Sequence, residues 1–200
     1  MTQSYFNRKA DMWDEKITEK NLNKLESMAK RLDIQPGSRV LDVGTGTGIL
    51  IPFLLEKVGN QGKLVCLDSA EKMLEKARAK NFKGNIEYVC SNISHTQFAD
   101  EVFDVVVCYS SFPHFRDKPQ ALKEISRVLR KGGKLFICHT SSRAAINEMH
   151  QHVPELSNDL IPDKEEMCHL LSSAGFGQID VRDETISYLA WAEKWEGGVK

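Results

Sequence analysis

The feature that most constrains the fold is a repeated alternation of short apolar runs with helical patterns. The apolar runs are rich in β-branched residues, show no polar alternation and lie at 39–43, 63–68, 86–90, 103–109 and 134–139. The helical patterns between them lie at 49–58, 70–80 and 119–129. Strands that are apolar on both faces are typical of a parallel sheet covered by helices on each side. The alternation therefore predicts an α/β, doubly wound fold.

Further predicted elements flank this core. Two helical stretches precede the first strand, and the one at 18–32 is clearly amphipathic. Helical stretches follow the fifth strand around 143–152 and at 163–174, and two last strands lie in QIDVRDE and ISYLAWAEK. We expect a mostly parallel seven-stranded sheet with helices on both faces and an antiparallel C-terminal strand. A length of 200 residues suits one domain, with a helical cap at 1–35 and a core at 36–195.

The turn after the first strand has an unusual glycine pattern. Within VLDVGTGTGIL, at 40–50, glycine occupies positions 44, 46 and 48. Glycine costs roughly 0.5–1 kcal/mol inside a helix or strand, so this cluster indicates a special turn. Ligands of doubly wound sheets bind beyond the carboxyl ends of the strands, where this turn lies. Its spacing, G-x-G-x-G, differs from the G-x-G-x-x-G of dinucleotide-binding proteins.

Two carboxylates narrow the class of ligand. Asp42 lies two residues before Gly44, where a carboxylate would repel a pyrophosphate but suits an ammonium group. Asp68 ends the second predicted strand, 20 residues after Gly48. A carboxylate at that position can accept hydrogen bonds from both ribose hydroxyls. The expected ligand is therefore a nucleoside that carries an ammonium group, and S-adenosyl-L-methionine (SAM) is such a ligand.

The motifs and their order resemble those of class I SAM-dependent methyltransferases. VLDVGTGTGIL followed by LVCLDSAEKML resembles motif I of that family and its acidic loop. The segments FDVVVCYSSFPHF, ALKEISRVLRKGGKLFI and LLSSAGFGQIDV are similar to its later blocks, and the resemblance covers roughly 36–195. It implies a Rossmann-like methyltransferase fold, SAM as cofactor and methyl transfer as the reaction.

The resemblance also implies roles for residues at matching positions. The glycine turn would pass beneath the methionine part of SAM, and Asp42 would reach its amino group through water or a backbone amide. Asp68 would hold the ribose diol. Asn92 stands where the family usually has an aspartate that binds adenine, and its side-chain carbonyl can accept the same hydrogen bond. The cofactor residues predicted in this way are Asp42, Gly44, Thr45, Gly46, Gly48, Asp68, Ser69, Met73, Asn92, Ile93, Cys108 and Tyr109.

The sequence limits the class of methyl acceptor. After the fourth strand it has neither an NPPY-like motif, found in enzymes that methylate amino groups of DNA or glutamine, nor the Pro-Cys nucleophile of cytosine methyltransferases. It lacks a basic stripe with interleaved aromatic residues, and its formal net charge is −1. We therefore expect a small-molecule acceptor, with no nucleic acid and no membrane as partner.

The cysteines and the N-terminus predict the compartment. The five cysteines are widely spaced, form no CxxC motif, and are interpreted as small buried hydrophobic residues in a reducing cytosol. Residues 1–16 mix acids and bases without an apolar core, unlike a signal peptide. We therefore expect a cytoplasmic protein; the sequence does not determine its oligomeric state.

Two histidines are predicted to act on the acceptor. His114 follows the fourth strand and His139 ends the fifth. Because these strands should be neighbours, we expect the two imidazoles to face each other across the transferred methyl as catalytic residues. One of them would act as a general base. The alternative is a metal site formed by His114, His139 and His150, although no metal is our first expectation.

Two segments could form a roof over the acceptor. In the N-terminal stretch, Tyr5, Phe6 and Trp13 could close over SAM, although an amphipathic helix packed on the sheet edge explains the pattern equally well. In the helix expected around 143–152, one polar stripe lies beside the apolar face. We expect that stripe to line the acceptor pocket; it consists of Arg143, Asn147 and His150.

Two other classes of function stay open from the sequence. One is a SAM-binding sensor or subunit without catalysis. The other is a nicotinamide-dependent oxidoreductase, which the glycine spacing disfavours. A methyltransferase that acts on a small molecule is the interpretation that the motifs favour.

Overall fold

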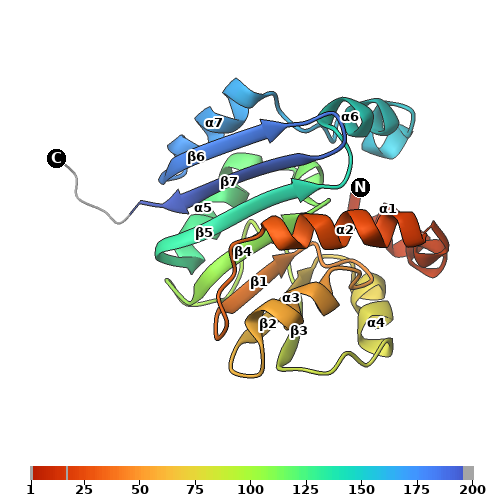
Figure 1. Cartoon of the computed structure of the whole chain (residues 1–200). Coiled ribbons are helices and arrows are strands. Elements are labelled where there is room, and N and C mark those ends of the chain that lie inside the picture. The colour runs from red at the N-terminus through yellow and green to blue at the C-terminus, as the bar shows by residue number, and fades with distance from the viewer. Residues whose placement is uncertain (1, 17, 196–200) are drawn as a thin grey trace.

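A seven-stranded sheet forms the centre of the molecule. The computed structural model describes residues 2–16 and 18–195. Its strands are β1 (Arg39–Val43), β2 (Lys63–Asp68), β3 (Ile86–Cys90), β4 (Phe103–Tyr109), β5 (Leu129–His139), β6 (Phe176–Asp183) and β7 (Tyr188–Lys194). They are arranged in the order β3-β2-β1-β4-β5-β7-β6 (Figure 1). β7 runs antiparallel to both β5 and β6, whereas β1 to β5 pair in parallel. The predicted doubly wound, mostly parallel sheet is confirmed.

Helices connect most of these strands. They are α1 (Thr2–Lys9), α2 (Glu19–Arg31), α3 (Ile51–Val58), α4 (Glu71–Ala79), α5 (Lys118–Val128), α6 (Arg143–Gln151) and α7 (Lys164–Ser173). Short 3-10 turns are η1 (Ala10–Met12), η2 (Asp14–Lys16), η3 (Phe112–His114) and η4 (Pro154–Leu156). Polar side chains cap four helices by accepting backbone N–H groups, as N-cap residues commonly do; these caps are Thr18, Asp117, Ser142 and Asp163. None of the helices in the described ranges has the length and apolar content that crossing a bilayer requires.

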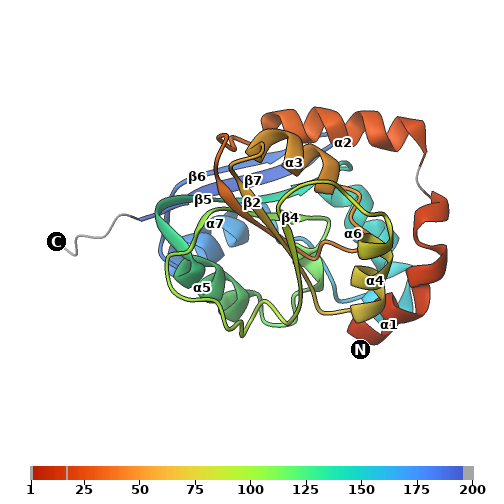
Figure 2. The ribbon, with the colours of Figure 1, turned by 90° about the horizontal axis from the view of Figure 1, so that it is seen from below.

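The strands are apolar throughout because both faces of the sheet are covered. Alternate residues of a strand point to opposite faces. Leu41 and Val106 belong to the core shared with α5 and α7, whereas their neighbours Val40 and Val107 belong to the core shared with α2 and α3. Viewed along the sheet in Figure 2, α2 and α3 lie on one side, and α5 and α7 lie on the other. The sheet is thereby held rigidly, with its carboxyl edge free to carry a site.

Two local features differ from the sequence prediction. β5 begins at Leu129 rather than at residue 134, because Leu129 pairs with Phe103 before a register irregularity. The cysteines are all free, but only Cys66, Cys108 and Cys138 are buried. Cys90 is exposed because β3 is an edge strand, and Cys168 is partly exposed on α7.

Candidate functional site

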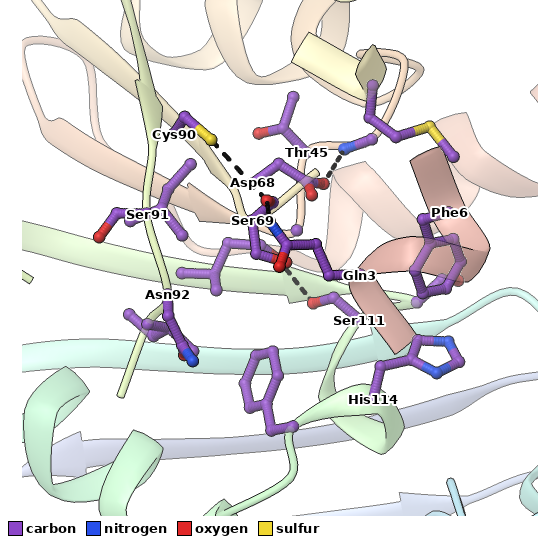
Figure 3. Close-up of a pocket in the computed structure, with 18 of the residues that line it drawn as sticks. Gln3, Phe6, Thr45, Asp68, Ser69, Cys90, Ser91, Asn92, Ser111 and His114 are labelled. Carbon is purple, nitrogen blue, oxygen red and sulfur yellow. Dashed lines mark hydrogen bonds between the residues drawn. The ribbon is translucent and has the colours of Figure 1, made fainter. Parts of the chain in front are cut away.

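A pocket of about 560 Å³ lies at the carboxyl ends of β1, β2 and β4. One wall comes from residues 43–49, 67–73 and 90–93, and we call it the loop wall. A second wall comes from residues 3–13 and 109–116, and we call it the histidine wall. Figure 3 shows side chains from both walls directed toward the same space. The pocket volume lies within the range common for small-molecule sites, roughly 300–1,000 Å³.

The glycine turn forms the base of the loop wall. Gly44 has φ +74°, and a Cβ atom there would lie 2.3 Å from the Cβ of Ser111. Gly44 is therefore required for the close approach of two chain segments below the pocket. Gly48 has φ +83°, and its Cβ would meet Ile51 and Phe82, so it serves helix packing. Of the predicted glycines, 44 and 46 line the pocket together with Thr45, whereas Gly48 does not.

Asp68 lies across the glycine turn at the end of β2. Its Oδ2 accepts a hydrogen bond from the N–H of Gly46, and its Oδ1 accepts one from the N–H of Ala70, each at 2.8 Å. Burial raises the pKa of Asp68, and these N–H groups oppose the rise. The carboxylate thus faces the pocket in a fixed orientation, with lone pairs left for further donors (Figure 3).

Asp42 occupies a different environment from Asp68. It is buried and does not line the pocket, and the hydroxyl of Thr45 donates to its Oδ2 at 2.7 Å. Burial raises the pKa of Asp42 to about 7. An effect of Asp42 on a ligand therefore passes through Thr45 or through space. This arrangement is compatible with the indirect contact expected from the sequence.

The remainder of the loop wall contains most of the other predicted cofactor residues. Ser69, Met73 and Ile93 line the pocket. Asn92 also lines it, but its side-chain carbonyl already accepts the N–H of Ser94 at 2.9 Å. Cys108 does not reach the pocket, because its side chain points into the core shared with α5 and α7.

The histidine wall begins with the N-terminal segment. Phe6 and Trp13 line the pocket and contact each other edge to face, with ring centroids 5.4 Å apart. Tyr5 points away from the pocket lining, since successive residues of a helix face different directions. Gln3 donates to the backbone carbonyl of Ser69, which ties α1 to the loop wall. The segment thus covers the pocket, with Phe6 and not Tyr5 as the contacting side chain.

His114 is the histidine that lines the pocket. It lies on η3 directly after β4, where Ser111 Oγ donates to the carbonyl of Val43 at 2.6 Å and anchors the turn. Its Nδ1 lies 2.8 Å from Oδ2 of Asp159. Its ring centroid lies 4.9 Å from those of both Phe6 and His150. His114 is therefore held by contacts on several sides.

His139 does not face His114 across the pocket, which corrects the expectation from the sequence. Its side chain is only 3% exposed, is absent from the pocket lining, and packs against the ring of Tyr188. At the end of β5 it alternates onto the α5 and α7 face, in line with Leu135 and Ile137. Burial lowers the pKa of His139 to about 3, so the imidazole is neutral. The imidazole beside His114 is that of His150.

The polar stripe of α6 holds the protein together instead of lining the pocket. Arg143 forms an ion pair with Asp183 at 2.8 Å. Asn147 both donates to the carbonyl of Ile161 and accepts its N–H, at 3.0 and 2.8 Å. His150 is buried, and its Nδ1 donates to the backbone carbonyl of Asp159. The sequence correctly predicted a polar stripe beside the apolar face of α6. The prediction that this stripe lines the acceptor pocket is wrong, because its side chains bond to other segments of the protein.

The metal alternative also has no support in this geometry. Within residues 2–16 and 18–195, no group of three or more histidine, cysteine, aspartate or glutamate side chains is arranged to hold a metal ion. Nδ1 of His114 and Nδ1 of His150 are both engaged with Asp159, and His139 is buried apart from the pocket.

Comparisons with known proteins identify the family. A model of the methyltransferase domain matches residues 41–137. The ubiquinone/menaquinone biosynthesis C-methyltransferase UbiE of Vibrio campbellii is 37% identical over 111 residues, which cover 54% of this chain and 43% of that protein. Its counterpart in Shewanella sp. (strain ANA-3) is 29% identical over 185 residues, covering 78% of this chain and 73% of that protein. Residues 41–137 of this chain thus form a SAM-dependent methyltransferase domain.

Solved structures agree with this methyltransferase fold. A SAM-dependent methyltransferase from Aquifex aeolicus superposes with a TM-score of 0.75 at 23% identity, covering 94% of this chain and 98% of that one. The methyltransferase from Haloferax volcanii in complex with its activator Trm112 gives a TM-score of 0.79 at 19% identity, covering 95% and 97%. At such identities the likeness concerns the fold. SAM is the methyl donor of the family.

Sequence reasoning missed several residues of this methyltransferase site. Asp159 lies 45 residues after His114, in a segment between α6 and α7 that carries no motif. Its approach depends on the course of the chain after α6, which a sequence pattern does not encode. The pocket residues that the sequence did not single out are Gln3, Ser4, Val43, Thr47, Ile49, Leu67, Cys90, Ser91, Ser110, Ser111, Phe115 and Arg116.

Proposed function

We propose that this protein transfers the methyl group of SAM to a small-molecule acceptor. The position of Asp68 carries the proposal. Its carboxylate faces the pocket and is fixed by the N–H groups of Gly46 and Ala70, so it can accept ribose hydroxyls without reorganising. Hydrogen bonds to a charged acceptor are worth about 1.5–3 kcal/mol each. Family membership supports SAM as the ligand that carries this ribose.

We assign cofactor binding to the loop wall. The backbone of Gly44, Thr45 and Gly46 would lie beneath the methionine part of SAM, and Asp42 would favour its ammonium group through Thr45. Other residues would contact the adenine and ribose, namely Ser69, Met73, Asn92 and Ile93. Tyr109 would lie beside the methionine chain, because it lines the pocket while its hydroxyl bonds to Thr140. Gly48 and Cys108 do not line the pocket and would support this wall through packing in the protein interior.

We assign the acceptor to the histidine wall. When bound, SAM supplies an electrophilic methyl group on a sulfonium, so the protein contributes chiefly proximity and orientation. Phe6 and Trp13 would exclude water from the reacting atoms, since both rings line the pocket and pack edge to face against each other. His114 would receive a proton from an acceptor that arrives protonated. Phe6, Trp13 and His114 are thus the acceptor-side residues that the sequence predicted and that line the pocket.

The relatives suggest which acceptors to test first. Two of them are named C-methyltransferases of ubiquinone and menaquinone biosynthesis. The match to the Vibrio protein spans less than half of that protein's length. Hydroquinones are therefore the first acceptors in our test set, with phenols and amines as the comparison classes. Free cysteines support a reducing compartment such as the cytoplasm for the reaction.

Calorimetric titration and turnover test the proposal together. We expect the protein to bind SAM but not NADH, and to release S-adenosylhomocysteine only when an acceptor from the set is present. Mass spectrometry of the acceptor should show the gain of one methyl group. Binding of SAM without turnover of any acceptor class would favour the sensor interpretation instead. Binding of NADH in place of SAM would overturn the assignment.

A further inference from the structure

Asp159, in the segment between α6 and α7, contacts the imidazoles of both His114 and His150. Oδ2 of Asp159 lies 2.8 Å from Nδ1 of His114, and the side chains are only 17% and 14% exposed. The backbone carbonyl of the same residue accepts a hydrogen bond from Nδ1 of His150. Asp159 therefore contacts His114 with its carboxylate and His150 with its main chain.

The position of Asp159 is fixed by the protein around it. Two residues further on, the backbone N–H and carbonyl of Ile161 are both bonded to the side chain of Asn147 on α6. Ile161 is also buried in the core. The carboxylate of Asp159 is thus delivered to His114 by an anchored segment.

This contact determines which nitrogen of His114 carries the proton. A carboxylate accepts hydrogen bonds, so Nδ1 of a neutral His114 is the protonated nitrogen and Nε2 keeps its lone pair. His150 does not compete for the carboxylate, because its own Nδ1 donates to a carbonyl. His114 lies in the pocket wall beside Phe6 (Figure 3). Its free Nε2 is therefore the atom that can serve the pocket.

We propose that Asp159 is a positioning residue that holds His114 in the tautomer with a free Nε2, and that the site is built for acceptors that arrive protonated. This inference rests on the proposed function for the role of Nε2. In the reaction, the proton on the accepting oxygen, nitrogen or carbon passes to Nε2 as that atom forms its bond to the methyl group. The sulfur–methyl bond breaks at the same time, and its electron pair stays on sulfur. The Asp159 carboxylate remains ionised and stabilises the resulting imidazolium.

The tautomer of His114 can be measured without any acceptor. We would label the histidine ring nitrogens with ¹⁵N and record spectra of the full chain, using His114→Gln to assign the signals. Wild type should show a protonated Nδ1 and an unprotonated Nε2 for His114. Asp159→Asn and Asp159→Ala should shift His114 toward the tautomer protonated at Nε2. His150 should keep its protonated Nδ1 in both variants, because its partner is a backbone carbonyl.

Glu155→Gln is the matched control, since it removes a carboxylate from the same segment without touching an imidazole. It should leave the His114 signals unchanged. If Asp159→Asn and Asp159→Ala also leave them unchanged while both proteins stay folded, the positioning role is overturned. The His150 signal reports folding of the segment in each variant.

Turnover provides the second measurement, with any hydroquinone, phenol or amine of the test set that is methylated. Asp159→Asn should lower kcat by about 10²-fold, within the usual contribution of a general base, while SAM affinity stays within about threefold. If the Asp159 variants change the His114 tautomer but the wild-type protein methylates no acceptor, the proposed function is contradicted and the positioning role is kept. An unchanged kcat with a methylated acceptor would overturn the inference and keep the proposed function.

Discussion

The two walls of the pocket are built in different ways. The loop wall consists of strand ends that are neighbours in the sheet, and backbone hydrogen bonds join them: the N–H groups of Gly44 and Thr45 both donate to the carbonyl of Leu67. The histidine wall combines α1 and η3, the segment after α6 contacts it from outside the pocket, and side chains make its main contacts. Phe6 packs on His114, and His114 bonds to Asp159. One wall is thus set by the sheet, and the other by side-chain contacts between distant segments.

This difference predicts a division of labour. Changes in the loop wall should alter the affinity for SAM, because its fixed carboxylate and backbone groups contact the cofactor. Changes in the histidine wall should alter turnover while SAM still binds. The following predictions test that division in order of decreasing effect.

Replacing the pocket histidine should have the largest effect. His114→Ala removes the group that we assign as general base, so kcat should fall by about 10²- to 10⁴-fold. The dissociation constant of SAM, measured by calorimetry, should stay within about threefold. His152→Gln is the control, because His152 is exposed and bonds to the backbone of its own helix. A normal kcat in His114→Ala would remove the catalytic role from this wall.

Gly44→Ala should damage the loop wall most strongly. The added Cβ would lie 2.3 Å from Cβ of Ser111, so the turn and η3 must separate. We expect SAM affinity to fall by about 100-fold, which corresponds to roughly 2.7 kcal/mol. Gly37→Ala separates this effect from backbone strain: its φ is also positive, at +84°, but its Cβ would meet no atom within 4 Å. It should lower the stability by about 1 kcal/mol and leave SAM affinity intact. Equal losses of affinity in the two variants would refute the close-approach explanation.

Asp68→Asn should have an intermediate effect on affinity. The amide keeps the shape of the side chain but loses the charge, and one of its two terminal atoms can no longer accept the N–H groups of Gly46 and Ala70. SAM should bind about 10-fold more weakly, since a hydrogen bond to a charged group is worth about 1.5–3 kcal/mol. Glu71→Gln, which removes a half-exposed carboxylate three residues away that is paired with Arg78, should bind SAM normally. An unchanged dissociation constant for Asp68→Asn would contradict the ribose assignment.

The pH dependence of SAM binding should show the smallest effect. Burial raises the pKa of Asp42 to about 7, so this group is protonated in the free protein at lower pH. A cationic ligand favours the ionised form and releases the proton on binding. Because Asp42 acts on the ligand only through Thr45 or through space, affinity should rise by about threefold in total as the pH increases from 5.5 to 7, and then level off. Asp42→Asn should flatten the dependence over this range. If the variant keeps the wild-type slope, Asp42 is not the group that senses the ligand.

The contrast between the walls also explains what the sequence could predict. Asp68 and Gly44 follow directly from the chain, because a strand end in a parallel sheet has a known place at the carboxyl edge. His139 shows the limit of that rule: it is at the correct strand end, but the alternation along β5 turns its side chain into the core. Asn147 and Asp159 depend on how the chain turns after α6, and that course is fixed by tertiary contacts such as the Asn147–Ile161 pair.

The place of β7 has a consequence for how the chain is made. It pairs with β5 and β6 at once, so it lies inside the sheet although it follows both of them in the sequence. Synthesis proceeds from the N-terminus, so β5 leaves the ribosome with one edge unpaired and β6 follows with no neighbour. Both strands lack their β7 partner until the chain has been synthesised as far as residue 194. Free strand edges are templates for wrong pairing. During this interval the nascent chain is most open to aggregation, and arrival of one seven-residue segment closes the sheet.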